Sequence, residues 1–265
     1  MNQAARVPVL MYHRVGVASN DWEARYCIGP EGFAAHMRAL SRAGFLGVTV
    51  DALLDWLEGG ERLPEKAIVI TFDDGFCGVR DHAQPVLEKL GWPFTVFLVS
   101  DLIGGEDAWT RNSNPAGVTY PLLGADEIQD MQQRGCTFHS HSRSHASLPT
   151  LDDAALADQL QGSRSFLAEL LGHEASYIAY PYGHLDSRVE AATRAAGYRA
   201  AFATQPGFNR QDVNRFRIRR LDIAGTDTPS MLMRKMRLGS NDGSLAHAAR
   251  YYLDRLTSRL PGVGR

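Results

Sequence analysis

The chain has 265 residues, of which 44% are hydrophobic and 22% are charged, and its formal net charge at pH 7 is -2. These values are ordinary for a soluble globular protein and exclude the strongly basic surface that nucleic-acid binding requires. No apolar run reaches the about 18 residues of a transmembrane helix, so we expect neither a nucleic-acid partner nor a transmembrane segment.

Apolar runs and helical periodicity alternate along the first half of the chain. The predicted strands of this half are 7–12, 45–50, 67–72 and 94–99. The predicted helices are 30–43, 51–58 and 81–90. Asp51 is the expected N-cap of the second helix. The polar segment 104–119, which contains Trp109, is long enough to be a functional loop rather than a connector.

The same alternation continues through the second half. The predicted strands are 136–138, 176–180, 200–204 and 216–223. The predicted helices are 125–134, 150–171, 186–196, 229–237 and 244–260. Thr150 and Asp153 have the spacing of a capping box at the start of the second of these helices.

Strands that alternate with helices favour parallel βα units, so the predicted fold class is α/β with a closed or nearly closed barrel. The chain contains no linker, internal repeat or low-complexity tract. We therefore expect residues 1–265 to form a single domain, with 225–265 as a C-terminal helical segment packed on the barrel. Nothing in the sequence sets the oligomeric state.

The predicted strand 67–72 runs directly into Asp73, Asp74 and Gly75. Two adjacent carboxylates at the end of a buried strand resist joint ionisation because their charges repel. A divalent cation bound by one carboxylate favours the ionised form of both. A solvated Asp-Asp-Gly turn is the alternative interpretation of these residues taken alone.

Two histidines, His141 and His145, lie four residues apart where another strand runs into a loop. Two imidazoles and one carboxylate are a common catalytic ligand set for zinc and related divalent ions. Such a site lowers the pKa of water and polarises an acyl oxygen. Two histidines in surface or packing positions are the alternative, and the nearby Asp-Asp strand end favours the metal site.

The polar residues that end the predicted strands would meet at one face of a parallel barrel, because strand C-termini share that face and catalysis is found there. These residues are His13, the pair Asp73 and Asp74, the cluster from His139 to His145, and Tyr182 with Gly183.

Three segments together resemble a known family. Thr71–Gly75 (TFDDG), His141–Leu148 (HSRSHASL) and Tyr180–Gly183 (YPYG) are similar, in this order, to motifs of the NodB-type polysaccharide deacetylases, carbohydrate esterase family four. The similarity extends from about Val7 to about Ile223. It implies a distorted (β/α)₇ barrel that removes acetyl groups from amino-sugar polymers with a divalent metal.

The resemblance also implies a role for each matched position. Asp74, His141 and His145 would bind the metal. Asp73 would be the general base toward the attacking water, and the backbone N–H of Tyr182 would help to stabilise the oxyanion. The implied cofactor is a divalent metal ion, zinc foremost, with nickel, cobalt and iron as alternatives that the same ligands accept.

Two positions depart from the family pattern. Ala179 stands where the family usually has an Arg that pairs with the catalytic Asp, as in the subset that deacetylates poly-N-acetylglucosamine-type exopolysaccharides; Arg220 on a neighbouring strand is a candidate replacement. The family's general-acid His lies in a Leu-x-His motif, and His247 matches its letters but falls inside a predicted helix. His13 ends the first predicted strand, as in the circularly permuted form of this barrel, and is assigned as the general acid.

Three further side chains have two open interpretations each. His139 occupies a position where the family usually has Gly, and either supports the metal ligands from behind or packs in the core. Trp109 and the ring of Tyr182 either stack on a sugar ring or serve as core aromatics.

The resemblance implies hydrolytic deacetylation of an N-acetylated carbohydrate, in the form of a polysaccharide, an oligosaccharide or a lipid-linked precursor. Two alternatives stay open: a metal-dependent hydrolase of another small amide, such as a formamide or a cyclic imide, and a carbohydrate-binding barrel that has lost activity. The polar start at residues 1–7 shows no signal peptide, and three cysteines without paired spacing suit a reducing compartment. We therefore expect a cytoplasmic enzyme.

Overall fold

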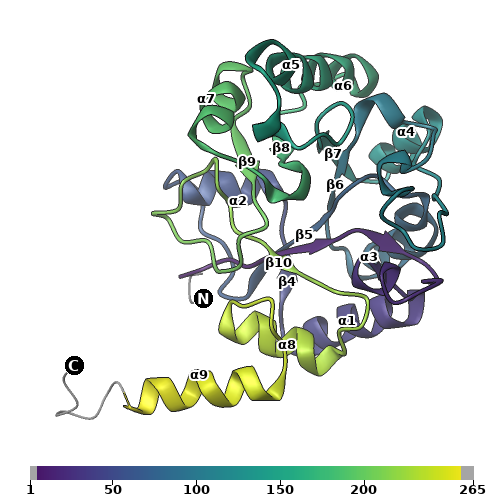
Figure 1. The fold of residues 1–265 in the computed structure, drawn as a ribbon. Coiled ribbons are helices and arrows are strands. Elements are labelled where there is room, and N and C mark those ends of the chain that lie inside the picture. The colour runs from purple at the N-terminus through teal and green to yellow at the C-terminus, as the bar shows by residue number, and fades with distance from the viewer. Residues whose placement is uncertain (1–4, 258–265) are drawn as a thin grey trace.

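A curved parallel sheet organises the fold in the computed structural model, which describes residues 5–257, with side chains to residue 254 (Figure 1). In this part of the chain the strand order is β10-β1-β5-β6-β7-β8-β9, and β4 pairs with β5 beside this path. The strands of the sheet are β1 Val9–Tyr12, β4 Leu46–Gly47, β5 Ala67–Phe72, β6 Thr95–Leu98, β7 Thr137–Ser140, β8 Tyr177–Ala179, β9 Ala200–Phe202 and β10 Leu221–Asp222. A separate parallel pair consists of β2 Arg14–Val15 and β3 Cys27–Ile28.

Helices connect the strands and cover the outside of the sheet (Figure 1). The α-helices are α1 Pro30–Arg42, α2 Val50–Leu57, α3 Gln84–Leu90, α4 Ala125–Gln133, α5 Asp153–Ala157, α6 Ser163–Leu171, α7 Ser187–Ala195, α8 Pro229–Leu238 and α9 Leu245–Thr257. Two π-helical segments, Val79–Ala83 and Asp158–Gly162, precede α3 and α6. Short 3-10 turns are Glu23–Arg25, Ser100–Leu102, Ala108–Thr110, Leu148–Thr150 and Pro181–Gly183.

The segment 216–223 closes the sheet into a distorted barrel. The backbone N–H of Ile218 donates to Ala201 O, and the N–H of Ala203 donates to Ile218 O, so the first part of the segment bonds β9. The second part is β10, which pairs in parallel with β1. The prediction of one continuous strand here is wrong, because the two halves of the segment pair with opposite edges of the sheet.

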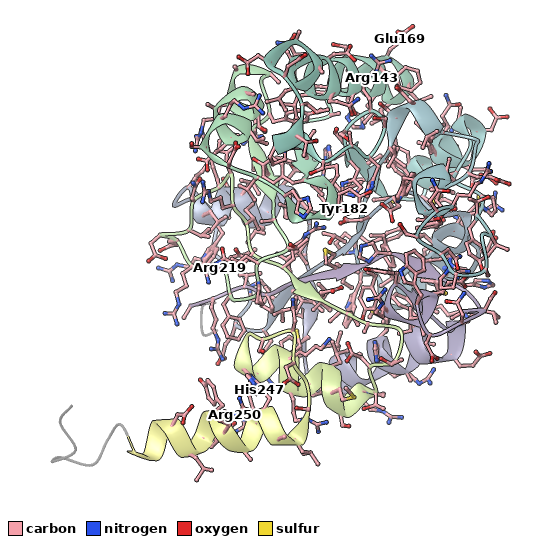
Figure 2. All side chains as sticks on the ribbon, in the orientation of Figure 1. Arg143, Glu169, Tyr182, Arg219, His247 and Arg250 are labelled. Atoms are coloured by element: carbon pink, nitrogen blue, oxygen red, sulfur yellow. The ribbon has the colours of Figure 1, made fainter. Side chains whose placement is uncertain are left out.

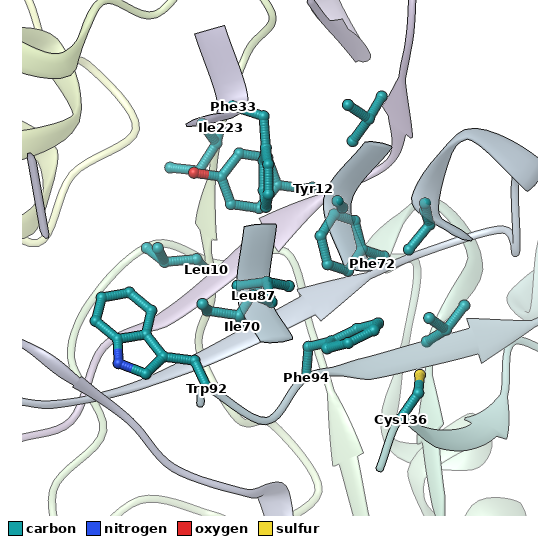
Figure 3. Packing of buried hydrophobic residues seen from close by; sticks show 14 of the residues in the cluster. Leu10, Tyr12, Phe33, Ile70, Phe72, Leu87, Trp92, Phe94, Cys136 and Ile223 are labelled. Carbon is teal, nitrogen blue, oxygen red and sulfur yellow. The ribbon is translucent and has the colours of Figure 1, made fainter. Parts of the chain in front are cut away.

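Side chains on β1 and β5 alternate between the two sides of the sheet, as strand geometry requires. Tyr12 and Phe72 face the helices, and Figure 3 shows Phe33 of α1 and Leu87 of α3 among the side chains packed with them. The ring centroids of Tyr12 and Phe33 lie 5.3 Å apart. A second buried cluster fills the barrel interior beside α2. Residues that directly follow β1 and β5 and point to the barrel interior therefore reach the end of the barrel.

Two predicted helix N-caps, Asp51 and Thr150, are each wrong by two residues. α2 begins at Val50, because the side chain of Thr49, and not of Asp51, accepts a hydrogen bond from the first turn. α5 begins after Asp152, whose carboxylate caps that helix, whereas Thr150 ends a 3-10 turn. In both cases a neighbouring side chain with the same capping chemistry takes the position.

The last two helices follow the barrel closure. α8 packs on α1, and α9 extends away from the barrel (Figure 1). The assignment of residues 1–265 to one domain, with 225–265 packed on the barrel, stays a prediction. Among the described helices, none combines the length and the apolar composition that a membrane crossing requires.

Candidate active site and metal centre

One end of the barrel holds a cavity of about 470 Å³ lined by side chains that follow four of its strands. The residues assigned from the sequence that line it are His13, Asp73, Asp74, His141, His145 and Tyr182. They follow β1, β5, β7 and β8, which are parallel, so their C-terminal ends share this face.

Backbone strain is concentrated at this cavity. Asp74, Ser142, His145 and Tyr182 have φ angles of 75°, 65°, 60° and 58°, and they are the non-glycine residues with positive φ in the described chain. A side-chain-bearing residue in this conformation costs about 1–3 kcal/mol. Three of these residues, Asp74, His145 and Tyr182, line the cavity, so the fold holds them against their own backbone preference at that place.

Arg220 forms a buried bidentate ion pair with Asp73. Its Nη1 lies 2.6 Å from Oδ1 and its Nη2 lies 2.8 Å from Oδ2 of the carboxylate. Burial by itself raises the pKa of Asp73, but the charge and hydrogen bonds of Arg220 outweigh burial and lower the pKa to about 2. Arg220, in the segment that closes the barrel, thus supplies the positive charge beside Asp73 that Ala179 cannot supply.

In the described part of the chain, the carboxylate of Asp74 has no arginine partner and faces two imidazoles. Its Oδ1 lies 3.4 Å from Nε2 of His141 and 3.4 Å from Nε2 of His145. One ligand atom from each of the three buried residues lies within 4.8 Å of the others. Asp74 Oδ1 is buried and has no hydrogen-bond partner among the described residues. Three acceptor atoms therefore converge on one point.

The protonation states of these groups suit a cation. Burial, followed by the charge of Asp73, raises the pKa of Asp74 well above its usual range. Burial lowers the pKa of His141 to about 4 and that of His145 well below 6.5, so both imidazoles are neutral at pH 7. A carboxylate oxygen and two neutral imidazole nitrogens fit a divalent ion, which would also offset the cost of ionising Asp74.

The two candidate histidine ligands are held in different ways. His141 Nδ1 donates to the carbonyl oxygen of Ala179 at 2.7 Å, which directs its Nε2 toward Asp74. His145 lies between two aromatic rings: Trp109 stacks on it with centroids 4.5 Å apart, and Tyr182 meets it edge-on at 4.5 Å.

A buried polar network forms the cavity wall, and the sequence analysis did not identify it. Glu23 accepts hydrogen bonds from Arg14 Nη2, Asn114 Nδ2, the Tyr120 hydroxyl and the backbone N–H of Ser19, at 2.7–2.9 Å. Burial raises the pKa of Glu23, but these partners outweigh burial and lower it. The sequence signal that could have pointed to this network is the length and polarity of segment 104–119, which contains Asn114.

Three other histidines named in the sequence analysis lie in three different settings. His13 lines the cavity, and its ring meets Tyr26 at 5.5 Å. His139 packs on Tyr177 at 4.5 Å, and burial lowers its pKa to about 3, which agrees with the core interpretation. His247 lies on α9, well separated from the labelled Tyr182 in Figure 2, so it takes no part in the cavity.

Comparisons with known proteins found similar sequences. A sequence profile described as polysaccharide deacetylase matches residues 60–201. The poly-beta-1,6-N-acetyl-D-glucosamine N-deacetylase of Staphylococcus epidermidis is 24% identical over 208 residues, which cover 75% of this chain and 68% of that protein.

Two solved structures share the fold. IcaB from Ammonifex degensii superposes with a TM-score of 0.72 at 27% identity, over 89% of this chain and 98% of that one. The Streptococcus pyogenes deacetylase PplD, in complex with acetate, superposes with a TM-score of 0.75 at 20% identity, over 88% of this chain and 99% of that one. These superpositions confirm the predicted distorted (β/α)₇ barrel.

Proposed function

This chain belongs to the polysaccharide deacetylase family, as its three motifs predicted, and from that premise we propose that it hydrolyses the N-acetyl groups of an amino-sugar carbohydrate. The observation that carries the proposal is the contrast between two neighbouring carboxylates. Asp73 is ionised by its pairing with Arg220, whereas Asp74 completes a buried site with two neutral imidazoles. Hydrolysis of an amide needs both a base and an electrophilic centre. Asp73 would be the base, and a cation held by Asp74 and the two imidazoles would be the electrophilic centre.

The name of the staphylococcal relative supports a substrate class. That relative is called an N-deacetylase of poly-beta-1,6-N-acetyl-D-glucosamine. In this chain the cavity has aromatic side chains at Trp22, Tyr26 and Tyr182, which offer apolar faces to a sugar ring. We therefore assign β-1,6-linked N-acetylglucosamine oligomers as the first substrate to test.

Asp74, His141 and His145 would hold a divalent cation, with zinc as the first candidate. When bound, such a cation polarises the acetyl oxygen and lowers the pKa of water toward neutrality. Asp73 would receive the proton of the water that attacks the acetyl carbon. Arg220 keeps Asp73 ionised at neutral pH, so its carboxylate can accept this proton.

His13 and Tyr182 would complete the reaction from the other sides of the cavity. The backbone N–H of Tyr182 is assigned to the oxyanion that forms when water adds to the amide carbon. His13 is assigned to donate a proton to the sugar nitrogen as the C–N bond breaks. The products are acetate and a free amino sugar, which balances one water against one amide bond.

A substrate panel tests this function. The metal-free protein is loaded with Zn²⁺, Co²⁺ or Ni²⁺ and mixed with β-1,6-linked N-acetylglucosamine oligomers, a formamide or a cyclic imide. The proposal predicts metal-dependent release of acetate from the oligomers and no turnover of the other two amides. Turnover of the formamide or imide alone would assign the barrel to another amide, and metal binding without any turnover would indicate an inactive barrel.

A further inference from the structure

We propose that Trp109 is a positioning residue for His145, which makes the loop 104–119 part of the candidate metal centre. This inference rests on the proposed metal ligands. The indole and imidazole rings stack with centroids 4.5 Å apart and planes inclined by 23°. One face of the indole is therefore covered by a residue that would bind the cation, so that face does not meet a sugar.

His145 needs such support more than His141 does. A metal-ligating histidine normally fixes its ring by donating its other N–H to an acceptor. His141 does so through Nδ1 to Ala179 O at 2.7 Å. His145 Nδ1 is buried, and it has no hydrogen-bond partner among the described residues. The orientation of the His145 ring is therefore set by what its faces and edges contact.

Two aromatic side chains make those contacts. Tyr182 meets the His145 ring edge-on, with an interplanar angle of 70°, but its own side chain is 50% exposed. Trp109 covers a face of the ring and belongs to the turn Ala108–Thr110. Stacking restricts rotation of the imidazole about its side-chain torsion, so that Nε2 stays directed toward Asp74.

The rest of the loop holds Trp109 in place. Asp107, which precedes this turn, is buried and accepts hydrogen bonds from Thr110 Oγ1 at 2.8 Å and from the backbone N–H of Tyr120. Asn114 and Tyr120 are bound in turn to Glu23. The indole is thus fixed by a network that ends on the N-terminal part of the cavity wall, although Trp109 lies 36 positions before His145 in the sequence.

The test measures Co²⁺ affinity of the metal-free protein by competition with a chromophoric chelator, with no substrate present. Trp109→Leu and Trp109→Met remove the flat ring but keep an apolar side chain, and Trp109→Phe keeps a ring that can stack. We expect the first two variants to bind Co²⁺ about 10- to 100-fold more weakly, as for loss of other groups that orient metal ligands. Trp109→Phe should recover most of the affinity. The absorption bands of bound Co²⁺ should change in the Leu and Met variants and return in the Phe variant.

Trp22→Ala is the matched control, because Trp22 lines the same cavity and packs on Tyr26 rather than on a candidate ligand. It should leave the Co²⁺ affinity unchanged. Equal Co²⁺ affinity and equal spectra in wild type, Trp109→Leu and Trp109→Met would overturn the inference. A wild type that binds Co²⁺ but releases no acetate would refute the proposed function while leaving this comparison intact; a wild type that binds no Co²⁺ would overturn both.

Discussion

Asp73 and Asp74 are neighbours in the chain, yet their carboxylates meet opposite surroundings. The strand geometry of β5 ends at Phe72, and the positive φ of Asp74 turns the chain so that both side chains reach the cavity. Arg220 lowers the pKa of the first carboxyl, and burial raises that of the second. Two like residues thereby acquire different chemistry from their partners alone.

Replacing Arg220 tests the electrostatic side of this division. Arg220→Met leaves Asp73 buried without a partner, so the pKa of Asp73 should rise and the acidic limb of the kcat/KM profile should move to higher pH. The unpaired carboxylate should also lower the free energy of unfolding by about 3–5 kcal/mol. The measurements are a pH–rate profile and urea unfolding. An acidic limb that stays where it is in wild type would show that Arg220 does not control Asp73.

A buried histidine between helices gives a pH-dependent stability at the scale of elements. His36 on α1 is fully buried, and its Nε2 contacts the carbonyl oxygen of Asp227, just before α8, at 2.7 Å. Burial lowers the pKa of His36. The unfolded chain binds a proton below about pH 6.5 and the folded chain does not, so acid favours unfolding.

Replacing His36 should therefore flatten the pH dependence of stability. In wild type this residue contributes a fall of up to about 1.4 kcal/mol in the unfolding free energy for each pH unit below 6.5. His36→Gln should remove that contribution while keeping a donor toward Asp227. Urea unfolding at several pH values between 7 and 5 measures it, with the exposed His173→Gln as control. An unchanged slope in His36→Gln would show that His36 is not the group responsible.

Glu23 links the N-terminal part of the cavity wall to loop 104–119. Glu23→Ala removes the common acceptor of Arg14, Asn114 and Tyr120, so loop 104–119 should loosen. We expect KM to rise more than kcat falls, because the wall shapes substrate binding rather than the proton transfers. Limited proteolysis should cut this loop sooner, whereas the exposed Glu31→Ala should behave as wild type. Unchanged KM and unchanged protection of the loop would contradict this role.

Local patterns predicted most elements because helix and strand periodicity depends on residues close in sequence. α1, α7 and α8 therefore lie within one or two residues of the predicted ranges. The caps at Thr49 and Asp152 were missed because nearby side chains offer the same chemistry, and packing decides between them. The strand 216–223 was predicted whole, since alternation does not reveal which neighbour each half pairs with.

The candidate site was predicted to the extent that its residues follow strands. The six assigned residues line one cavity, as parallel strand ends require. Arg220 was only a candidate, because its pairing with Asp73 depends on how the barrel closes. The stacking of Trp109 on His145 was not predicted, since no local pattern links a residue of one loop to a side chain in the loop after another strand.

At the scale of the whole molecule, the first strand lies between the last strand and the strand of the two carboxylates. β1 pairs with β10 and with β5, both in parallel. This order brings His13, at the end of β1, into the cavity that also holds Asp73. The N-terminal strand therefore supplies a candidate general acid, whereas the order of motifs in the family would place this histidine near the C-terminus.

Metal binding should also be visible as stability of the whole fold. A cation that binds the folded state alone adds about 2.7 kcal/mol when its concentration is 100 times its dissociation constant. For a chain of this size we expect the unfolding midpoint to rise by about 5–10 °C when Zn²⁺ or Co²⁺ is added, and to fall again with a chelator. His141→Ala should abolish the increase. A midpoint that ignores both metal and chelator would argue against the three-residue site.

The most direct measurement compares Asp73→Asn with Asp74→Asn for Co²⁺ binding and for acetate release from N-acetylglucosamine oligomers. If Asp73 is the base and Asp74 a ligand, Asp73→Asn keeps Co²⁺ and loses about 10²- to 10⁴-fold in kcat. Asp74→Asn loses both the metal and the activity. An Asp73→Asn protein that retains kcat, or an Asp74→Asn protein that binds Co²⁺ like wild type, would contradict this division of labour.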